Sequence, residues 1–259
     1  MSEDKKHTKK HGTAFGVDIG GSGIKGAPVD LGDGEFGADR VRIPTPQPST
    51  PDAVAATVAE VVDSFHLDKG VPIGVTFPAV ILHGVAQSAA NVDKSWIGTN
   101  VEKAVQHATG RKVLAVNDAD AAGYAEALYG AAKGVDGVVL MVTLGTGIGS
   151  ALIVDGHLVP NTELGHLEID GHDAESRAAE SARDRDDLSW EAWGERLQRY
   201  FTVVENLFWP DLIVVGGGVS KHHEKFLPLL DLRTKIIPAE LRNAAGIIGA
   251  AALAADYRG

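Results

Sequence analysis

The sequence predicts an α/β fold, and three observations lead to this prediction. Short apolar segments typical of buried strands alternate along the chain with segments of helical periodicity. Several of these strands end in glycines or in an Asn-Asp pair, and functional groups of α/β enzymes commonly project from such strand ends. The succession of apolar strand, glycine turn and returning strand also occurs twice. It therefore predicts a duplicated domain whose two glycine turns face each other across a cleft.

The first half of the chain is expected to alternate strands and helices around a proline-rich connection. Residues 42–51 carry four prolines and are expected to be extended. Asp52 follows and is expected to cap a helix that continues to about His66, because a carboxylate accepts hydrogen bonds from the first helical amides. The remaining expected strands are 17–19, 27–30, 71–77 and 113–116, and the remaining expected helices are 101–110 and 119–128.

The second half of the chain repeats this alternation. Residues 137–144 are almost wholly apolar, as in a strand that is buried on both faces. Residues 150–154 are expected to return as its hairpin partner, and 211–215 as a further strand. Residues 191–208 are amphipathic and 244–255 are rich in alanine, and both are expected to be helices. The acidic stretch 170–187 is expected to be a solvated helix or loop.

The composition excludes several classes of protein. The 259 residues include no cysteine, which excludes disulfides, thiolate metal ligands and cysteine nucleophiles. A net charge of −11 argues against a general nucleic-acid binder. No apolar run approaches the roughly 20 residues that span a bilayer, and the N-terminus lacks the apolar segment of a signal peptide. The chain is therefore expected to be cytoplasmic, with residues 1–12 as a disordered leader.

A phosphate-binding turn is predicted at residues 15–26, with the sequence FGVDIGGSGIKG. Glycines let backbone amides approach an anion, Ser22 can donate a hydrogen bond, and Lys25 adds a positive charge. Asp18 can hold a hydrated magnesium ion. The run matches neither the dinucleotide-binding nor the Walker-type glycine pattern. The alternative is a tight turn between strands that needs glycine and binds nothing.

Other polar groups follow strands further along the chain. Residues 145–149 form a second glycine turn, and residues 216–220 form a third that is suited to a distal phosphate or a nucleoside. Asn117 and Asp118 stand at the end of a strand, where general bases of α/β enzymes commonly project. Residues 163–168 form a dense polar cluster around a glycine.

These motifs together resemble the ROK family of sugar kinases, within the hexokinase and actin-like ATPase superfamily. The resemblance covers residues 14–255 and is carried by seven motifs in order: DIGGSGIKG, TPQP, NVDKSWIGT, NDADAAG, LGTGIGSAL, ELGHLEIDG and VVGGGVS. It implies duplicated actin-like (ribonuclease H-like) domains with a cleft between them. The implied small domain comprises residues 13–117 plus 244–259, and the implied large domain comprises 118–243.

The resemblance also implies roles for individual residues. Asp118 matches the base that accepts the proton of the sugar 6-hydroxyl, although the same residue could simply be a helix N-cap. Sugar contacts are implied for Asn117, Asp118, Glu163, His166 and Glu175. Contacts to phosphate or nucleotide are implied for Asp18, Gly20, Gly21, Ser22, Gly23, Lys25, Thr146, Gly147, Gly217 and Gly218. Asp18 is expected to hold magnesium through water.

Some positions allow a structural interpretation beside the functional one. A histidine such as His166 is often only a satisfied structural residue. In many ROK proteins the matching histidine binds zinc with cysteines, and since this chain has none, no structural zinc is expected. Ser88 and Asn91 lie in a loop whose counterpart closes over the sugar, and they either contact the sugar or shape the loop. Trp96 is expected to anchor that loop by packing.

The resemblance is strongest to the actinobacterial polyphosphate-using branch of the family. It implies phosphoryl transfer from polyphosphate, with ATP as a further donor, to the 6-hydroxyl of glucose. Mannose is an alternative acceptor, and an ATP-only glucokinase is an alternative enzyme. A basic track within residues 221–242 (Lys221, His222, His223, Lys225, Arg233, Lys235 and Arg242) would suit polyphosphate, but an ordinary solvated face is an equal interpretation.

Two other classes remain to be weighed. A ROK transcriptional regulator would carry an N-terminal DNA-binding domain, whereas about a dozen residues precede the first expected strand. An ATP-driven protein of the actin type is disfavoured by the cluster of Glu163, His166 and Glu175. The family further implies a homodimer.

Overall fold

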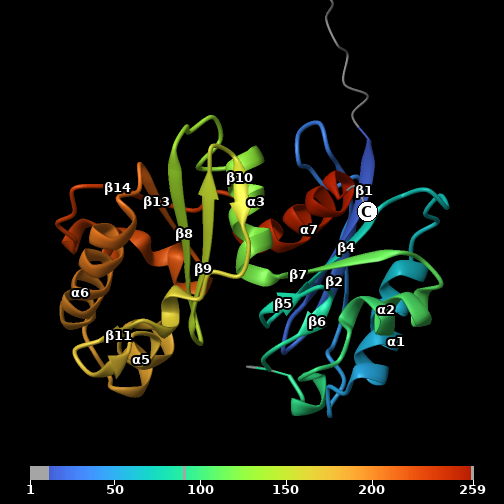
Figure 1. Cartoon of the computed structure of the whole chain (residues 1–259), viewed down its shortest axis with the longest axis horizontal. Helices are drawn as coiled ribbons and strands as arrows, with labels where there is room; N and C mark the ends of the chain where they lie inside the picture. The colour runs from blue at the N-terminus through green and yellow to red at the C-terminus, as the bar shows by residue number, and fades with distance from the viewer. Residues whose placement is uncertain (1–11, 90–91, 258–259) are drawn as a thin grey trace, which may run out of the picture.

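Two five-stranded sheets form the framework of the computed structural model, which describes residues 12–89 and 92–257 (Figure 1). The strand order of the first sheet is β3-β2-β1-β4-β7, and that of the second is β10-β9-β8-β13-β14. The first sheet contains β1 (Thr13–Ile19), β2 (Ile24–Asp30), β3 (Val41–Ile43), β4 (Ile73–Phe77) and β7 (Val113–Asn117). The second contains β8 (Val138–Leu144), β9 (Ile148–Val154), β10 (His157–Val159), β13 (Leu212–Gly216) and β14 (Lys235–Pro238).

The two sheets share one topology. Each begins with an antiparallel hairpin that closes over a glycine turn, at Ile19 and Ile24 in the first sheet and at Leu144 and Ile148 in the second. In each sheet the first strand of the hairpin then pairs with a parallel strand, β4 or β13. The predicted α/β fold and its duplication are therefore confirmed.

The helices are arranged in layers around the two sheets. One face of the first sheet packs on α1 (Pro51–Asp63) and α2 (Val101–Thr109), and one face of the second packs on α6 (Trp190–Phe208). The remaining faces are covered by α7 (Ala245–Asp256) and α3 (Asp118–Tyr129), which pack against each other between the sheets (Figure 1). This helix pair thus connects the two sheets through the faces that it covers.

Glycines allow α7 to lie unusually close to its neighbours. A Cβ atom on Gly16 of β1 or Gly74 of β4 would lie 1.9 Å from a carbonyl oxygen of α7. A Cβ on Gly249 of α7 would lie 1.8 Å from the Ala121 carbonyl oxygen of α3. Backbone therefore packs directly on backbone at three places, which no larger residue permits.

The first helix begins differently from the prediction. Asp52 does not cap it. Thr50 occupies the N-cap position and Pro51 opens the helix, because its fixed φ suits the first turn and its missing N–H would have no partner there. Asp52 lies in the first turn, and α1 ends at Asp63 rather than near His66. The proline-rich segment also contributes a short strand, β3, at its start.

Short elements that the sequence did not reveal lie between the longer ones. They include two small hairpins, β5 (Ile81–Leu82) with β6 (Val85–Ala86) and β11 (Glu168–Ile169) with β12 (His172–Asp173). The acidic stretch contains α4 (Glu175–Ala178) and α5 (Glu180–Arg185). Five 3-10 turns complete the elements: η1 (Lys94–Trp96), η2 (Leu164–His166), η3 (Gly218–Lys225), η4 (Leu227–Leu229) and η5 (Arg242–Ala244).

Two sequence predictions are not tested by these elements. Residues 1–11 of the predicted leader lie outside the described residues. The division into a small domain (13–117 plus 244–259) and a large domain (118–243) stays a prediction. Among the described residues, none of the helices has the length and apolar character needed to cross a bilayer.

Candidate active site

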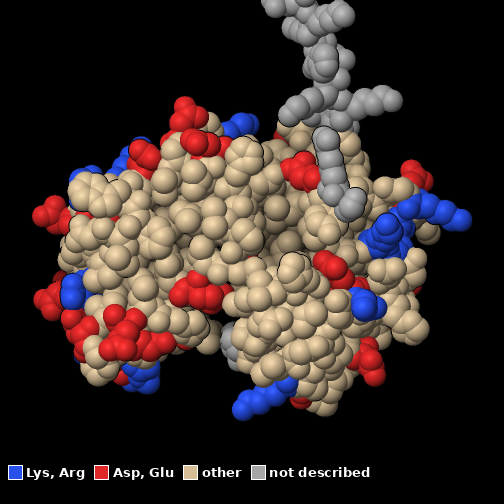
Figure 2. Space-filling view, in the orientation of Figure 1, with Lys and Arg blue, Asp and Glu red and all other residues tan. Residues whose placement is uncertain are grey.

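A cleft of about 670 Å³ opens between the two halves of the chain. Figure 2 shows the surface indented between these halves at its lower edge. The cleft brings together many of the predicted site residues from distant parts of the sequence, namely Asp18, Lys25, Asn117, Asp118, Thr146, Gly147, Glu163, His166, Glu175 and Gly217. Of the residues that the structure describes, those lining the cleft do not include Gly20, Gly21, Ser22, Gly23 or Gly218.

Asp118 lies where β7 passes directly into α3. Its carboxylate Oδ1 accepts a hydrogen bond of 2.8 Å from the Ala119 N–H, and no described side chain donates to it. The N-cap of α3 is Asn117 rather than Asp118, since the Asn117 Oδ1 accepts from the N–H groups of Ala119 and Asp120. The structural alternative for Asp118, a capping role, is therefore filled by its neighbour.

The environment of Asp118 raises its pKa to about 6. The largest cause is desolvation by the surrounding protein, although the side chain itself is exposed to the cleft. The negative charges of Asp18 and Glu163 raise the pKa further, and the backbone hydrogen bonds oppose the shift. At neutral pH the group is mostly ionised yet basic enough to accept a proton.

Asn117 performs a structural task while it faces the cleft. Besides capping α3, its Nδ2 donates to the Ala79 carbonyl oxygen at 3.1 Å. Ala79 belongs to the segment after β4 that also lines the cleft. The Asn117 amide therefore fixes the segment after β4 to the end of the neighbouring strand β7, and it keeps one N–H for another acceptor.

The predicted cation-binding residue Asp18 is already bonded by protein groups. Its Oδ2 lies 3.0 Å from the Lys25 ammonium, and its Oδ1 accepts a hydrogen bond of 2.9 Å from the Thr76 hydroxyl. Both Asp18 and Lys25 are about three quarters buried. The positive charge of Lys25 therefore lines the cleft but is partly neutralised by Asp18.

The first glycine turn is held in shape from outside. The Arg42 guanidinium donates to the Ser22 carbonyl oxygen at 2.9 Å, and a Cβ on Gly23 would lie 2.7 Å from the Arg42 Nε. The Thr45 hydroxyl donates to the Gly20 carbonyl oxygen. A larger residue at position 23 would therefore displace the Arg42 guanidinium, a close approach that the sequence pattern alone did not reveal.

The second and third glycine turns lie on the opposite side of the cleft. Thr146 and Gly147 line it directly, and a Cβ on Gly147 would lie 2.4 Å from the Glu175 Oε2. Gly217 has a φ of 84° and a Cβ there would lie 2.1 Å from the Leu144 carbonyl oxygen. Only glycine fits at position 217, and both turns therefore expose backbone close to the cleft.

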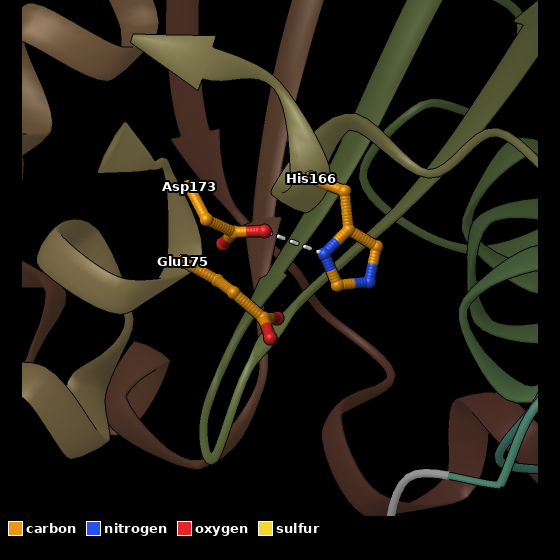
Figure 3. Close-up of side chains that lie close together, drawn as sticks. All are labelled: His166, Asp173 and Glu175. Atoms are coloured by element: carbon orange, nitrogen blue, oxygen red, sulfur yellow. Dashed lines mark hydrogen bonds and ion pairs between the residues drawn. The ribbon is translucent and has the colours of Figure 1, made fainter. Parts of the chain in front are cut away.

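Three of the predicted sugar contacts, Glu163, His166 and Glu175, line the cleft beside these turns, and Figure 3 shows two of them, His166 and Glu175, with Asp173. The His166 Nδ1 lies 2.9 Å from the Asp173 Oδ2, and its Nε2 lies 4.0 Å from the Glu163 Oε2. The bond to Asp173 is the largest cause that raises the pKa of His166. Burial raises the pKa of Glu163, and His166 opposes that shift. Glu175 accepts from the Ile148 N–H at 3.0 Å.

The same group is the one set of described side chains whose geometry could hold a metal ion. Ligand atoms of His166, Asp173 and Glu175 all lie within 4.8 Å of one another. All three side chains already have protein partners, because His166 bonds to Asp173 and Glu175 bonds to the Ile148 amide. Hydrogen bonding therefore accounts for the cluster. The expected absence of a structural zinc stays a prediction.

Sequence reasoning missed several residues of the cleft. Asn243, Ala245 and Gly246 line it from the start of α7, and Asp173 orients His166. Of the predicted basic track, Arg242 lines the cleft, with a φ of 50°. The other members do not line it among the described residues. A strand-to-helix transition at 239–245 was the only signal in the sequence that could have located this wall.

The loop predicted to close over the sugar is partly described. Ser88 lines the cleft, and its hydroxyl accepts from the Val80 N–H at 3.3 Å. Asn91 lies outside the described residues. Trp96 is fully buried, packs on the Phe77 ring at 4.6 Å and donates to the Ser49 carbonyl oxygen, in agreement with its predicted role as an anchor.

The duplicated fold and the two-sided cleft are those of a sugar kinase of the ROK class, and residues 14–181 match the ROK family. The chain belongs to the ROK family. It is 52% identical over 245 residues to the polyphosphate glucokinase of Mycobacterium tuberculosis (strain CDC 1551 / Oshkosh), an alignment that covers 94% of this chain and 91% of the relative. The resemblance inferred from the seven motifs is therefore confirmed.

Solved structures agree with this assignment. The inorganic polyphosphate/ATP-glucomannokinase of Arthrobacter sp. strain KM superposes with a TM-score of 0.89 at 58% identity, over 94% of this chain and 98% of that one. A ROK family glucokinase from Streptomyces griseus, solved with glucose and AMPPNP, superposes with a TM-score of 0.78 over 95% and 100%. At 23% identity the second match supports the fold alone.

Proposed function

We propose that this chain is a polyphosphate glucokinase, which transfers a phosphoryl group from inorganic polyphosphate to the 6-hydroxyl of glucose. The observation that carries the proposal is the position of Asp118, a carboxylate of raised pKa that lines one cleft together with Asp18 and Lys25 of the first hairpin and with Thr146 and Gly147 of the second glycine turn. The identity of 52% to the M. tuberculosis polyphosphate glucokinase supports the choice of donor and acceptor.

The proposed chemistry assigns a separate task to each group of residues in the cleft. Asp118 accepts the proton of the sugar 6-hydroxyl as that oxygen attacks the terminal phosphorus. Asn117, Glu163, His166 and Glu175 bind the sugar hydroxyls and hold the attacking oxygen in line with the leaving oxygen. The backbone amides of the glycine turns, including Thr146 and Gly147, stabilise the charge that spreads over the transferred group.

Magnesium would fit the proposed site as an ion coordinated largely by water and by the donor phosphates. Asp18 supplies a single carboxylate, and both of its oxygens already accept a bond from Lys25 or Thr76. Mg²⁺ commonly uses one or two carboxylates and keeps several waters, so one partly engaged carboxylate suffices. When bound, the ion would neutralise charge on the donor phosphates.

A second acceptor and a second donor are supported by the Arthrobacter match. That protein is a polyphosphate/ATP-glucomannokinase, and it shares 58% of its aligned residues with this chain. We therefore propose that ATP also serves as donor and that mannose, which differs from glucose at the 2-hydroxyl, is also phosphorylated. Family membership further supports a homodimeric, cytoplasmic enzyme.

Initial rates with polyphosphate and with ATP, each on glucose and on mannose, test the proposed function. Formation of glucose 6-phosphate from polyphosphate is the expected result. Activity with ATP alone would reassign the protein as an ordinary glucokinase. No phosphorylation of either sugar by either donor would refute the proposal entirely. Light scattering coupled to size exclusion tests the dimer independently.

A further inference from the structure

A chain of hydrogen bonds that the proposed chemistry does not use joins the two halves of the molecule beside the cleft. The Asp120 Oδ2 accepts from the Asn161 N–H at 2.7 Å. The Asn161 Oδ1 in turn accepts from the Ile81 N–H at 2.9 Å, and its Nδ2 donates to the Ile81 carbonyl oxygen at 3.0 Å. The three residues come from α3, from the segment between β10 and η2, and from β5.

Asn161 is shaped for this connection. Its φ of 59° lies in the left-handed region, which costs free energy for most residues but which asparagine adopts more readily. The side-chain amide then pairs with both the N–H and the C=O of Ile81, as a neighbouring strand would. One side chain thus replaces a piece of β-pairing between parts of the chain that are 80 residues apart.

Asp120 is a costly group to bury, and the proposed chemistry gives it no task. Its side chain is 2% exposed, and its Oδ1 has no hydrogen-bond partner among the described residues. Burial, together with the charges of Glu163 and Asp118, raises the pKa of this carboxyl to about 7. Burying a carboxyl with one unpaired oxygen costs free energy of folding. The hydrogen bond of its other oxygen to Asn161 is therefore expected to serve a purpose besides stability.

The bond from Asp120 reaches the proposed sugar-binding segment. Asp120 stands two residues after Asp118 in the first turn of α3, and Asn161 stands two residues before Glu163. The segment between Asn161 and Glu163 is further fixed by Ser150, whose hydroxyl donates to the Thr162 carbonyl oxygen and accepts from the Leu164 N–H. The orientation of Asn161 is therefore transmitted along a short, well-bonded segment to Glu163.

The other end of the chain holds the opposite wall. Ile81 follows Ala79 and Val80, both of which line the cleft. Asn117 of the neighbouring strand β7 binds the Ala79 carbonyl oxygen within the first half of the molecule, whereas Asn161 attaches the same wall to the second half at Ile81. The two hydrogen bonds at Ile81 are both made by the Asn161 side chain.

We propose that Asp120 and Asn161 are positioning residues for the sugar end of the cleft, which set Glu163 and the Ala79–Ile81 wall at a fixed distance from Asp118. This inference rests on the proposed function, because it takes the cleft to be the sugar site. The donor turns at Thr146 and Gly147 make no bond to Asp120 or Asn161 among the described residues. Loss of the connection therefore weakens the binding of sugar and spares the binding of donor.

Four variants separate this role from a general contribution to stability. Asn161→Gly keeps the left-handed backbone and the bond to Asp120 but removes both bonds to Ile81. Asp120→Ala removes the bond to Asn161, and Asp120→Asn retains an oxygen that accepts it. Asp187→Gly is the matched control, because Asp187 also has a positive φ, of 47°, and does not line the cleft among the described residues.

The measurements are KM for glucose, KM for the donor and kcat, with glucose binding by calorimetry and the melting temperature of each variant. Asn161→Gly and Asp120→Ala are expected to raise the KM and Kd for glucose by about tenfold or more, since small displacements of binding groups have effects of up to ~10². The donor KM is expected to change less than about twofold, and Asp120→Asn to restore glucose binding to within about threefold.

Two results would overturn the inference. One is an unchanged glucose KM in both Asn161→Gly and Asp120→Ala. The other is an equal rise in the KM for glucose and for donor that follows the loss of melting temperature, as a purely structural role predicts. A wild-type protein that binds glucose without phosphorylating it would instead refute the proposed function, and the glucose Kd values of the variants would still decide the positioning role.

Discussion

The Lys25 ammonium lies 3.0 Å from the Asp18 carboxylate, and the two residues stand directly opposite each other on β1 and β2. The sequence suggested separate tasks for them, with Lys25 on the donor phosphates and Asp18 on a magnesium ion. The ion pair couples the two tasks. A phosphate that attracts Lys25 leaves the negative charge of Asp18 available to a cation. A cation that binds Asp18 in turn leaves the positive charge of Lys25 available to the phosphate.

The pH dependence of activity is expected to follow the protonation of Asp118, which the Lys25–Asp18 pair influences. Activity is expected to fall as the pH drops through about 6, because protonated Asp118 cannot accept a proton. Asp18 already raises the pKa of Asp118, and Lys25→Met would leave the charge of Asp18 unbalanced. The acidic limb of kcat/KM should therefore move to higher pH in Lys25→Met, with a higher KM for the donor. An acidic limb that stays in place would show that Lys25 does not screen Asp18.

Replacement of the proposed base isolates proton transfer from binding. Asp118→Asn preserves the shape of the side chain and can still accept the Ala119 N–H bond. The variant is expected to bind glucose within a few-fold of the wild type and to lose ~10²–10⁴ in kcat, the usual contribution of general base catalysis. Calorimetry gives the first quantity and a coupled assay the second. Near-normal turnover would remove Asp118 from the role of base.

The close packing of α7 predicts a change of stability with an informative sign. In most helices a glycine-to-alanine change stabilises by up to about 1 kcal/mol. In Gly249→Ala the new Cβ would lie 1.8 Å from the Ala121 carbonyl oxygen, so the variant should lose about 3 kcal/mol or more in the free energy of unfolding.

Gly70→Ala is the matched control for Gly249→Ala, because no atom lies within 4 Å of the new Cβ there. Its change should stay within about 0.5 kcal/mol. Chemical denaturation measures both variants. A stabilised Gly249→Ala would mean that α7 and α3 lie further apart than the structure places them.

Removal of metal ions tests two predictions together. Chelation is expected to abolish phosphoryl transfer and added Mg²⁺ to restore it, because the donor carries a high negative charge. Elemental analysis of the purified protein is expected to find no stoichiometric zinc, since the chain has no thiolate ligands. One zinc per chain that disappears in Asp173→Ala would instead assign the His166, Asp173 and Glu175 cluster to a metal.

The sequence predicted the elements that local chemistry determines. The apolar strands β4, β8 and β13 and the helices α2, α3 and α6 lie within a few residues of their predicted bounds, because periodicity and terminal glycines mark them. The start of α1 differed from the prediction because Pro51 and Asp52 both favour a helix start. Pro51 precedes Asp52 in the sequence and occupies the first helical position, so Asp52 lies within the first turn. Small hairpins such as β5 and β6 are too short to produce a periodic signal.

Within the cleft, the predicted residues were those that belong to recognisable motifs. Asp118 directly follows β7, Thr146 stands two residues after the end of β8, and both line the cleft. What the sequence did not show were partners fixed by the tertiary fold, such as Asp173 for His166 and Asn161 for Ile81. The position of Lys25 was anticipated but its partner was not, because the register of β1 against β2 decides which side chains meet.

The place of α7 has a consequence for how the molecule is assembled during synthesis. Among the described elements, β1 and β4 leave the ribosome early, whereas α7, whose backbone fits onto Gly16 and Gly74, follows all the others. One face of the first sheet, with Ala14, Ala27 and Val29, therefore stays uncovered until α7 has been translated. The second sheet meets no such delay. The first sheet is thus translated before the second sheet but has both of its faces covered later.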